Sequence, residues 1–230
     1  MDSPQVSENR NQLKRIGVIY EGATDYKVIE NILVGYLGED NFDLKQIQPN
    51  LDATDTRINH GGWEKVLIRC SSPIFVQDLD NHDFIVIQID TDQIFIHQNF
   101  SGINTNLPYA DLYNEIIKRF EQIIGTQIYN KYRNKIIFAI SMYTIECWLL
   151  VLHCKDKQDA IKNCLDRLHK CLQKGNSKIN PNSKKPKEYD YLSKDFNKRK
   201  NLIANYKLNP SLESFVNELN EKIPSFKLIA

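Results

Sequence analysis

The chain has 230 residues, of which 41% are hydrophobic and 26% are charged, and this composition is typical of a protein that buries the core of one domain, with or without a smaller appendage. No apolar run approaches the roughly 18 to 20 residues of a membrane span, and the polar N-terminal segment lacks the apolar stretch of a secretory signal. We therefore expect a cytoplasmic protein that has no membrane partner.

The formal net charge of +1 is distributed unevenly along the chain. Residues 1–150 carry 13 Lys and Arg against 20 Asp and Glu, a net charge of −7. Residues 151–207 carry 15 basic against 6 acidic residues, a net charge of +9, and the last 23 residues add −1. An acidic part beside a basic part suits a protein that holds cations and binds a polyanion such as nucleic acid. Lysine-rich but merely solvated helix faces would produce the same numbers.

The cysteine pattern predicts reduced thiols. Five cysteines, an odd number without Cys-x-x-Cys spacing, indicate neither a disulfide framework nor a zinc ribbon. Spacings of seven residues would place cysteines on one helical face as small hydrophobic residues, although zinc binding is the alternative. The two pairs with this spacing are Cys147 with Cys154, and Cys164 with Cys171.

Short apolar runs predict the strands of a parallel sheet, because strands buried on both faces read as nearly continuous Ile and Val. We expect strands at 15–21, near 44–48, at 83–90 and at 135–143, after a disordered tail over residues 1–13. Helical patterns between them predict helices near 24–37, after the "HGG" of residues 60–62, and at 108–124. This alternation implies right-handed crossovers and an α/β fold.

The chain after residue 143 has helical patterns. We expect a helix in "TIECWLLVLHC" and further helices over 156–174, 187–206 and 210–223. A polar, Lys-, Asn- and Pro-rich segment at 174–187 predicts a mobile loop.

Acidic residues follow the predicted strands, at the edge of the sheet where ligands of α/β proteins bind. The stretch "IGVIYEGATDY" at 16–26 holds Glu21 and Asp25, and "QIDTDQ" holds Asp90 and Asp92. Residues two apart in a strand point to the same side, so Asp90 and Asp92 can converge on a cation such as Mg²⁺. Each acid also has a simpler interpretation, as a polar strand exit or, for Asp25, as a partner of a helix N-terminus. Glu146 lies inside an apolar stretch and either faces the same site or points to solvent.

A strand ending in "YEG", an acid three residues after the glycine and a later strand ending in "IDTD" resemble a TOPRIM domain, the metal-binding fold of topoisomerases, DnaG-type primases and OLD-family nucleases. The stretches "SMYTIECWLL" and "NPSLESFVNEL" further resemble small standalone TOPRIM-like proteins of prokaryotic anti-phage defence islands. The resemblance implies a Rossmann-like TOPRIM domain over residues 14–155, with a mostly parallel sheet of about four strands flanked by helices. Residues 156–230 would form a helical extension packed on it, basic between 155 and 207.

The resemblance also implies roles for the acidic residues. Glu21, Asp90 and Asp92 would be catalytic, and Mg²⁺, with Mn²⁺ as an alternative, would be held by Glu21, Asp25, Asp90, Asp92 and Glu146. Gly61 and Gly62 resemble a glycine-bearing segment of the standalone proteins and receive no role. The implied chemistry is metal-dependent hydrolysis of phosphodiester bonds in nucleic acid.

Basic residues of the C-terminal part supply candidates for binding nucleic acid and for stabilising the charge of a scissile phosphate. These are Lys184, Lys185, Lys187, Lys198 and Arg199. Nearby aromatic residues would either stack on bases or anchor helices to the core; they are Tyr189, Tyr191, Phe196 and Tyr206.

Three functions follow for testing. The first is a magnesium-dependent nuclease acting in anti-phage defence, where its partners would be an ATPase or another defence protein, or a second copy of the chain. The second is a catalytically silent TOPRIM-like subunit that binds nucleic acid or regulates a partner. A receiver-type signalling domain is the third, and the Glu-Gly signature argues against it. His60, His82 and His97 lack a visible nucleophile partner, which argues against a serine or cysteine hydrolase.

Overall fold

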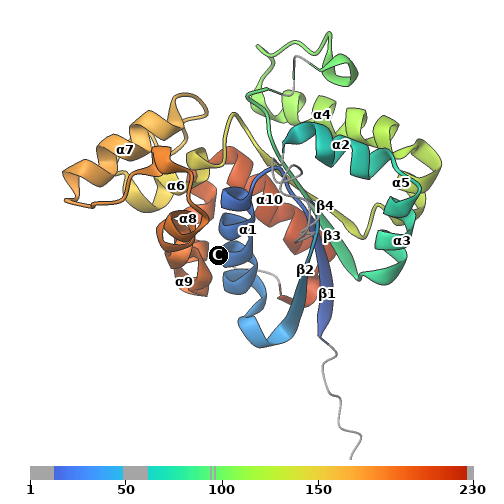
Figure 1. The fold of residues 1–230 in the computed structure, drawn as a ribbon, viewed down its shortest axis with the longest axis horizontal. Coiled ribbons are helices and arrows are strands. Elements are labelled where there is room, and N and C mark those ends of the chain that lie inside the picture. Colours follow the sequence, from blue (N-terminus) through green and yellow to red (C-terminus); the bar gives the residue numbers. More distant parts are fainter. Residues whose placement is uncertain (1–12, 49–61, 94, 96, 227–230) are drawn as a thin grey trace, which may run out of the picture.

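Four parallel strands form the sheet at the centre of the molecule (Figure 1), in a computed structural model that describes residues 13–48, 62–93, 95 and 97–226. The strand order is β2-β1-β3-β4, and all three neighbouring pairs are parallel. The bounds are β1 Lys14–Ile19, β2 Phe42–Gln48, β3 Phe84–Asp90 and β4 Ile136–Ser141. The expected α/β class, with about four parallel strands flanked by helices and a helical C-terminal extension, is confirmed.

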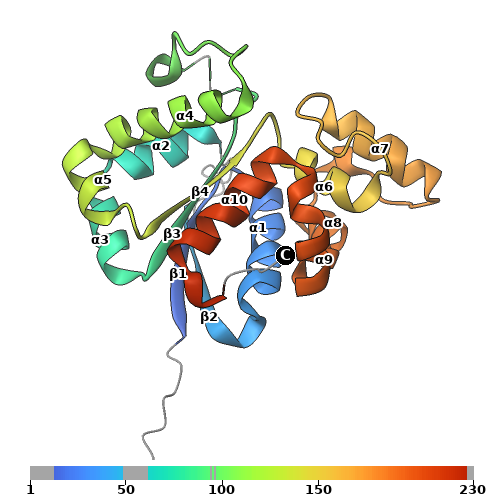
Figure 2. The ribbon, with the colours of Figure 1, turned by 180° about the vertical axis from the view of Figure 1, so that it is seen from behind.

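Helices cover both faces of the sheet (Figures 1 and 2). One face carries α2 Trp63–Ser71, α3 Ile74–Asn81, α4 Tyr109–Ile124 and α5 Thr126–Tyr132. The other face is covered by α1 Ala23–Leu37 together with the helices that follow β4. These later helices are α6 Glu146–His153, α7 Cys164–Lys174, α8 Pro186–Ser193, α9 Arg199–Asn205 and α10 Pro210–Lys222.

Alternate residues of each strand feed two separate hydrophobic clusters. In β3, Val86 packs with α1 and the C-terminal helices, whereas Ile85 and Ile87 pack with α2 to α5. Each of these three side chains has no exposed surface. A strand that is buried on both faces needs apolar residues at every position, which explains the uninterrupted Ile and Val runs of the sequence.

The helical extension belongs to the same core as the sheet. The Trp148 ring of α6 stacks on Phe215 of α10 with centroids 5.5 Å apart, and its indole N–H donates to Ser211 Oγ at 2.7 Å. Lys222, near the end of α10, donates to the carbonyl of Ile136 in β4. The C-terminal helices therefore support the strands that carry the acidic residues.

Two predicted helices are shorter or more broken than expected. The pattern at 156–174 forms a helix only from Cys164, and residues 187–206 form α8 and α9 with a 3-10 turn at Lys194–Asn197 between them. This turn buries Phe196 completely against α1, where a Cβ on Gly35 would lie 1.9 Å from the Phe196 carbonyl oxygen. The free energy gained by burying the Phe196 ring here exceeds the cost of interrupting the helix. Helix α5 was not predicted, and it follows directly from the turn at Gly125, whose φ is +90°.

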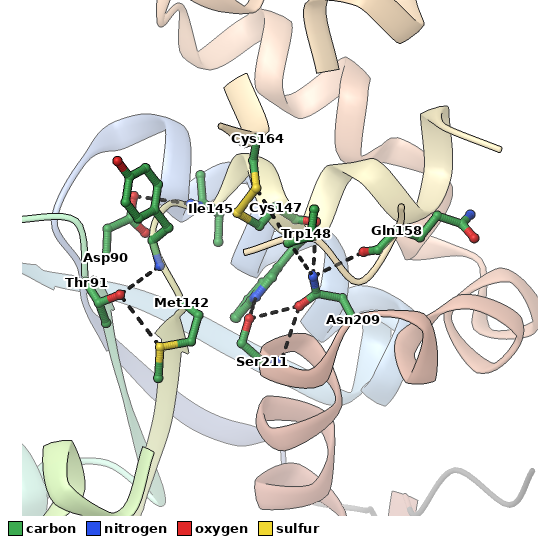
Figure 3. Close-up of a disulfide and its surroundings, with 12 residues drawn as sticks. Asp90, Thr91, Met142, Ile145, Cys147, Trp148, Gln158, Cys164, Asn209 and Ser211 are labelled. Atoms are coloured by element: carbon green, nitrogen blue, oxygen red, sulfur yellow. Dashed lines mark hydrogen bonds between the residues drawn. A yellow bond between two sulfur atoms is a disulfide. The ribbon is translucent and has the colours of Figure 1, made fainter. Parts of the chain in front are cut away.

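The expectation of reduced thiols is wrong for four of the five cysteines. Disulfides join Cys147 to Cys164 and Cys154 to Cys171, with Cα atoms 4.9 and 5.5 Å apart, and Cys70 is a buried free thiol. The first bond joins α6 to α7 (Figure 3), and the second joins Cys154, which directly follows α6, to α7. The same spacing that suggested apolar helix faces thus produces two parallel cross-links.

Along the described residues, none of the helices combines the length and apolarity that crossing a bilayer requires. The predicted tail falls almost wholly outside the described part of the chain, as do His60 and Gly61. Gly62 precedes α2 with a φ of +120°, and its amide donates to the Glu21 carbonyl at 2.7 Å.

Candidate functional site

The five predicted acids lie at one edge of the molecule, beyond the carboxyl ends of the strands. Glu21 follows β1, Asp90 is the last residue of β3, and Asp92 lies two residues further on. Asp25 is in the first turn of α1, and Glu146 begins α6. Each carboxylate is close enough to influence the pKa of at least one other, so the structure brings all five together in an acidic cluster.

Gln88 joins the two halves of the acidic cluster. This fully buried residue of β3 accepts a hydrogen bond from the Glu21 amide at 2.9 Å and donates one to Asp90 Oδ1 at 3.1 Å. The Asp90 amide in turn donates to Glu21 Oε2 at 3.1 Å. Sequence reasoning missed Gln88, although a polar residue two positions before Asp90 in an apolar strand, and therefore on the same side, was a usable signal.

The N-terminus of α6 holds Asp90 from the opposite side. The Ile145 amide donates to Asp90 Oδ2 at 3.2 Å (Figure 3), so both oxygens of this carboxylate accept hydrogen bonds. Helix N-termini favour negative charge. The orientation of Asp90 is thereby fixed by β3 and α6 together.

Gly22 has a steric role beside Asp25. A Cβ at position 22 would lie 2.7 Å from Asp25 Oδ2, closer than carbon and oxygen normally approach. The backbone of Gly22 has an ordinary extended φ of −139°, so the lack of a side chain, rather than conformational freedom, makes glycine suitable here. The Glu-Gly pattern thus makes room for the second acid four residues after Glu21.

Glu146 is fully buried, and a lysine and a tyrosine bind one of its oxygens. Lys184 Nζ and the Tyr189 hydroxyl both donate to Oε1, and Tyr189 is completely buried. Oε2 has no hydrogen-bond partner among the described residues. A buried, unpartnered carboxylate oxygen is expensive to desolvate, so this atom is the best candidate for binding a ligand.

Burial and mutual repulsion shift the pKa values of the cluster. Desolvation first, and then the charges of neighbouring acids, raise the pKa of Asp25 and Asp90 well above their usual range. Desolvation and the charge of Asp92 also raise the pKa of Glu21. Burial acts to raise the pKa of Glu146 as well, but the Lys184 ammonium outweighs it, so this pKa lies below its usual value.

Lys184 is the one predicted basic candidate that reaches the acidic cluster in the described structure. Its ammonium binds Glu146 and interacts electrostatically with Asp25 and Asp90. The Lys184 side chain is 47% exposed. Lys198 pairs with Asp195, and Arg199 donates to the carbonyls of Tyr36 and Phe226, which is a structural role. Lys185 and Lys187 are exposed near the start of α8, and their nucleic-acid role stays a prediction.

The aromatic residues of the C-terminal part mostly anchor helices. Tyr189, Phe196 and Tyr206 are buried, whereas Tyr191 is 65% exposed on α8. Base stacking is therefore wrong for the first three in this conformation. Sequence reasoning did not connect Tyr189 with Glu146, because the 43 residues between them give no local pattern.

The donor atoms of the acidic cluster suit a hard divalent cation. All five acids offer carboxylate oxygens, which Mg²⁺ and Mn²⁺ prefer, and Glu146 Oε2 is buried without a partner. No three Asp, Glu, His or Cys side chains in the described ranges already converge as a complete ligand set. Because Mg²⁺ usually takes only one or two carboxylates together with water and phosphate oxygens, the cluster fits such an ion without a closed protein cage.

Comparison of the chain with protein-family models, curated proteins and solved structures finds no significant match. The TOPRIM resemblance thus rests on the quoted motifs.

Proposed function

We propose that the protein is a TOPRIM-like, magnesium-dependent nuclease. The observation that carries the proposal is the acidic cluster itself, in which three acids from the ends of β1 and β3 lie near two acids from α1 and α6, and one oxygen of Glu146 is buried without a partner among the described residues. A bound divalent ion would act as a Lewis acid and lower the pKa of a water molecule. Glu21, Asp25, Asp90, Asp92 and Glu146 would hold it.

The residues of the chain have separable tasks in this proposal. Glu21, whose pKa is raised by burial, suits a general acid or base. Lys184, half exposed beside the carboxylates, offers a positive charge to an incoming phosphate. Gln88 and Tyr189 position Asp90 and Glu146.

The wider biological setting belongs to the same proposal. A cytoplasmic role in anti-phage defence, with an ATPase or a second copy of the chain as partner, rests on the resemblance alone. The basic segment 151–207 supplies the charge for a polyanionic substrate. The catalytically silent subunit remains the second candidate, because the salt bridge between Lys184 and Glu146 would also stabilise a cluster that performs no chemistry.

Incubation of the purified protein with single- and double-stranded DNA and RNA tests the proposal. We expect cleavage with Mg²⁺ or Mn²⁺ that stops in chelator and falls about 100-fold or more in Lys184→Ala, the range seen when a charge-stabilising group is lost. Lys118→Ala is the control, because Lys118 is exposed on α4, pairs with Glu115 and is not a candidate for nucleic-acid binding, so this variant should cut normally. Cleavage that persists in chelator would rule out the metal-dependent mechanism, and absence of cleavage with and without native partners would favour the silent subunit.

A further inference from the structure

A cavity of about 200 Å³ opens next to Asp92, at the carboxyl ends of β3 and β4. Its walls are mainly apolar and come from four parts of the chain. Phe95 follows β3, Leu112 belongs to α4, Met142 and Tyr143 follow β4, and Ile161 precedes α7. Because Asp92 belongs both to this wall and to the acidic cluster, a ligand in the cavity would lie beside the proposed site of hydrolysis.

The size and lining of the cavity suit one flat ring system. It is smaller than the roughly 300 to 1,000 Å³ of pockets that take drug-sized ligands. Tyr143 and Ile161 are 39% and 36% exposed, which is high for large apolar side chains, and both line the cavity. Thr105 adds an exposed hydroxyl group for polar ring edges, and Lys162 places a positive charge at the same wall.

The backbone holds Tyr143 in an unfavourable conformation. Its φ is +72°, in the left-handed region that a bulky side chain rarely adopts. The amide of Tyr143 donates to Thr91 Oγ1 at 2.7 Å, and its carbonyl accepts the amides of Thr91 and Asp92 at 3.0 Å each. These three hydrogen bonds fix the residue to the segment that ends in Asp92. Such strain commonly marks positions with a function in binding.

We propose that this cavity receives one unpaired nucleobase, with Tyr143 as its stacking surface, so that the protein acts on single-stranded nucleic acid. The inference rests on the proposed function, because it places the phosphate of the same strand at the acidic cluster. An aromatic ring stacks on any base, and Lys162 would bind an adjacent phosphate. A base in a duplex would first have to leave its stack, so duplexes bind less well.

Binding of a dye-labelled single strand of mixed sequence, and of its duplex, measured by fluorescence anisotropy tests this proposal. Ca²⁺ replaces Mg²⁺ in this experiment so that binding is measured without cleavage. We expect Tyr143→Ala to weaken single-strand binding about 5- to 100-fold and to leave duplex binding unchanged. Tyr143→Phe should bind like the wild type. Tyr191→Ala is the matched control, because Tyr191 is exposed on α8 and does not line the cavity.

A second variant separates loss of stacking from loss of folding. Thr105 is exposed, so Thr105→Trp should fill the cavity without disturbing the core and should weaken single-strand binding as Tyr143→Ala does. Equal binding of single strands by both variants and the wild type, or equal losses on single strand and duplex, would overturn the proposal. If the single-strand effect appears but no metal-dependent cleavage is ever found, the nuclease assignment fails and the nucleobase cavity stands.

Discussion

The two carboxylate oxygens of Glu146 have different roles in the acidic cluster. One carboxylate oxygen binds Lys184 and Tyr189, whereas the other is buried without a partner among the described residues. The first oxygen holds the side chain in place, and the second remains available. Burial, and then repulsion among the neighbouring acids, raises the pKa of Asp25 and Asp90. Either a proton or a bound cation would relieve the repulsion.

The raised pKa of Asp25 predicts how the stability of the metal-free protein depends on pH. A folded-state pKa above the unfolded value of about 3.9 gives stability that is fully present below that pH and is lost as the pH rises through the folded pKa. Asp25→Asn removes the buried charge at almost the same volume. We therefore expect the variant to gain stability relative to wild type with rising pH, by about 1.4 kcal/mol for each unit by which the pKa is raised.

Urea denaturation in chelator, at a series of pH values from 4 to about 8, measures this difference in the free energy of unfolding. The difference between wild type and variant cancels the contributions of carboxylates far from Asp25 and retains the part that comes from its repulsion with Glu21, Asp90 and Glu146. Added Mn²⁺ should stabilise the wild type more than the variant at the upper end of the range. A difference that does not change with pH would contradict the assignment of a strongly raised pKa to Asp25.

Among the elements, α6 and α7 form a cross-linked pair that carries part of the site. Glu146 begins α6, Cys147 follows it, and the segment after α7 leads to Lys184. Asn209 connects the segment between α6 and α7 to α10. Its side-chain amide donates to the Gln158 carbonyl at 3.2 Å, and its Oδ1 caps α10 (Figure 3). Disulfides of this kind are typical of oxidising compartments, so the cytoplasmic location stays a prediction.

Reduction of the two disulfides should destabilise the protein. Each closes a loop between residues 17 positions apart, and because the loops overlap we expect a combined loss of about 2 to 5 kcal/mol in the free energy of unfolding. Denaturation with and without a dithiol reductant measures the loss. The variant with all four paired cysteines replaced by alanine is the control and should not respond to the reductant. Titration of five thiols in the unfolded, unreduced protein would contradict both bonds, since only Cys70 is free.

The contact between α1 and the turn that joins α8 to α9 depends on Gly35. A Cβ there would lie 1.9 Å from a backbone oxygen, which cannot move as freely as a side chain. We expect Gly35→Ala to lower the free energy of unfolding by about 1 to 3 kcal/mol, despite the better helix propensity of alanine. Gly175→Ala is the matched control: its nearest neighbour would be 3.5 Å away, so its stability should change little. Equal stabilities of the two variants would show that α1 and this turn do not pack as described.

For the molecule as a whole, the sequence predicted what depends on local pattern. Apolar runs identified the sheet because its strands are buried on both faces, and acids after the strands were expected to meet because parallel strands end at one edge. Glu146 was expected at the same edge because it follows the fourth predicted strand. The role of Lys184 was not predictable, since five similar basic residues had equal claims until packing of the C-terminal helices brought one to Glu146.

Long-range packing also explains the incorrect predictions. The disulfides require α6 and α7 to lie side by side, and spacing within each helix says nothing of that. The break between α8 and α9 requires room on α1 for the backbone of Phe196, and Gly35 provides it because it has no side chain. The contacts of Gln88 with Glu21 and of Tyr189 with Glu146 were missed because the partners lie 67 and 43 positions apart.

The central claim is that the acidic cluster binds a divalent cation, and calorimetric titration of Mn²⁺ into the wild type and Asp92→Asn tests it most directly. Asp92 is exposed, so this variant should fold normally, and Asp43→Asn, an exposed acid near the start of β2, is the control. The account predicts saturable binding by the wild type and Asp43→Asn and binding at least about tenfold weaker, a loss of about 1.4 kcal/mol, in Asp92→Asn. Equal binding by all three proteins, or no binding by the wild type, would contradict it.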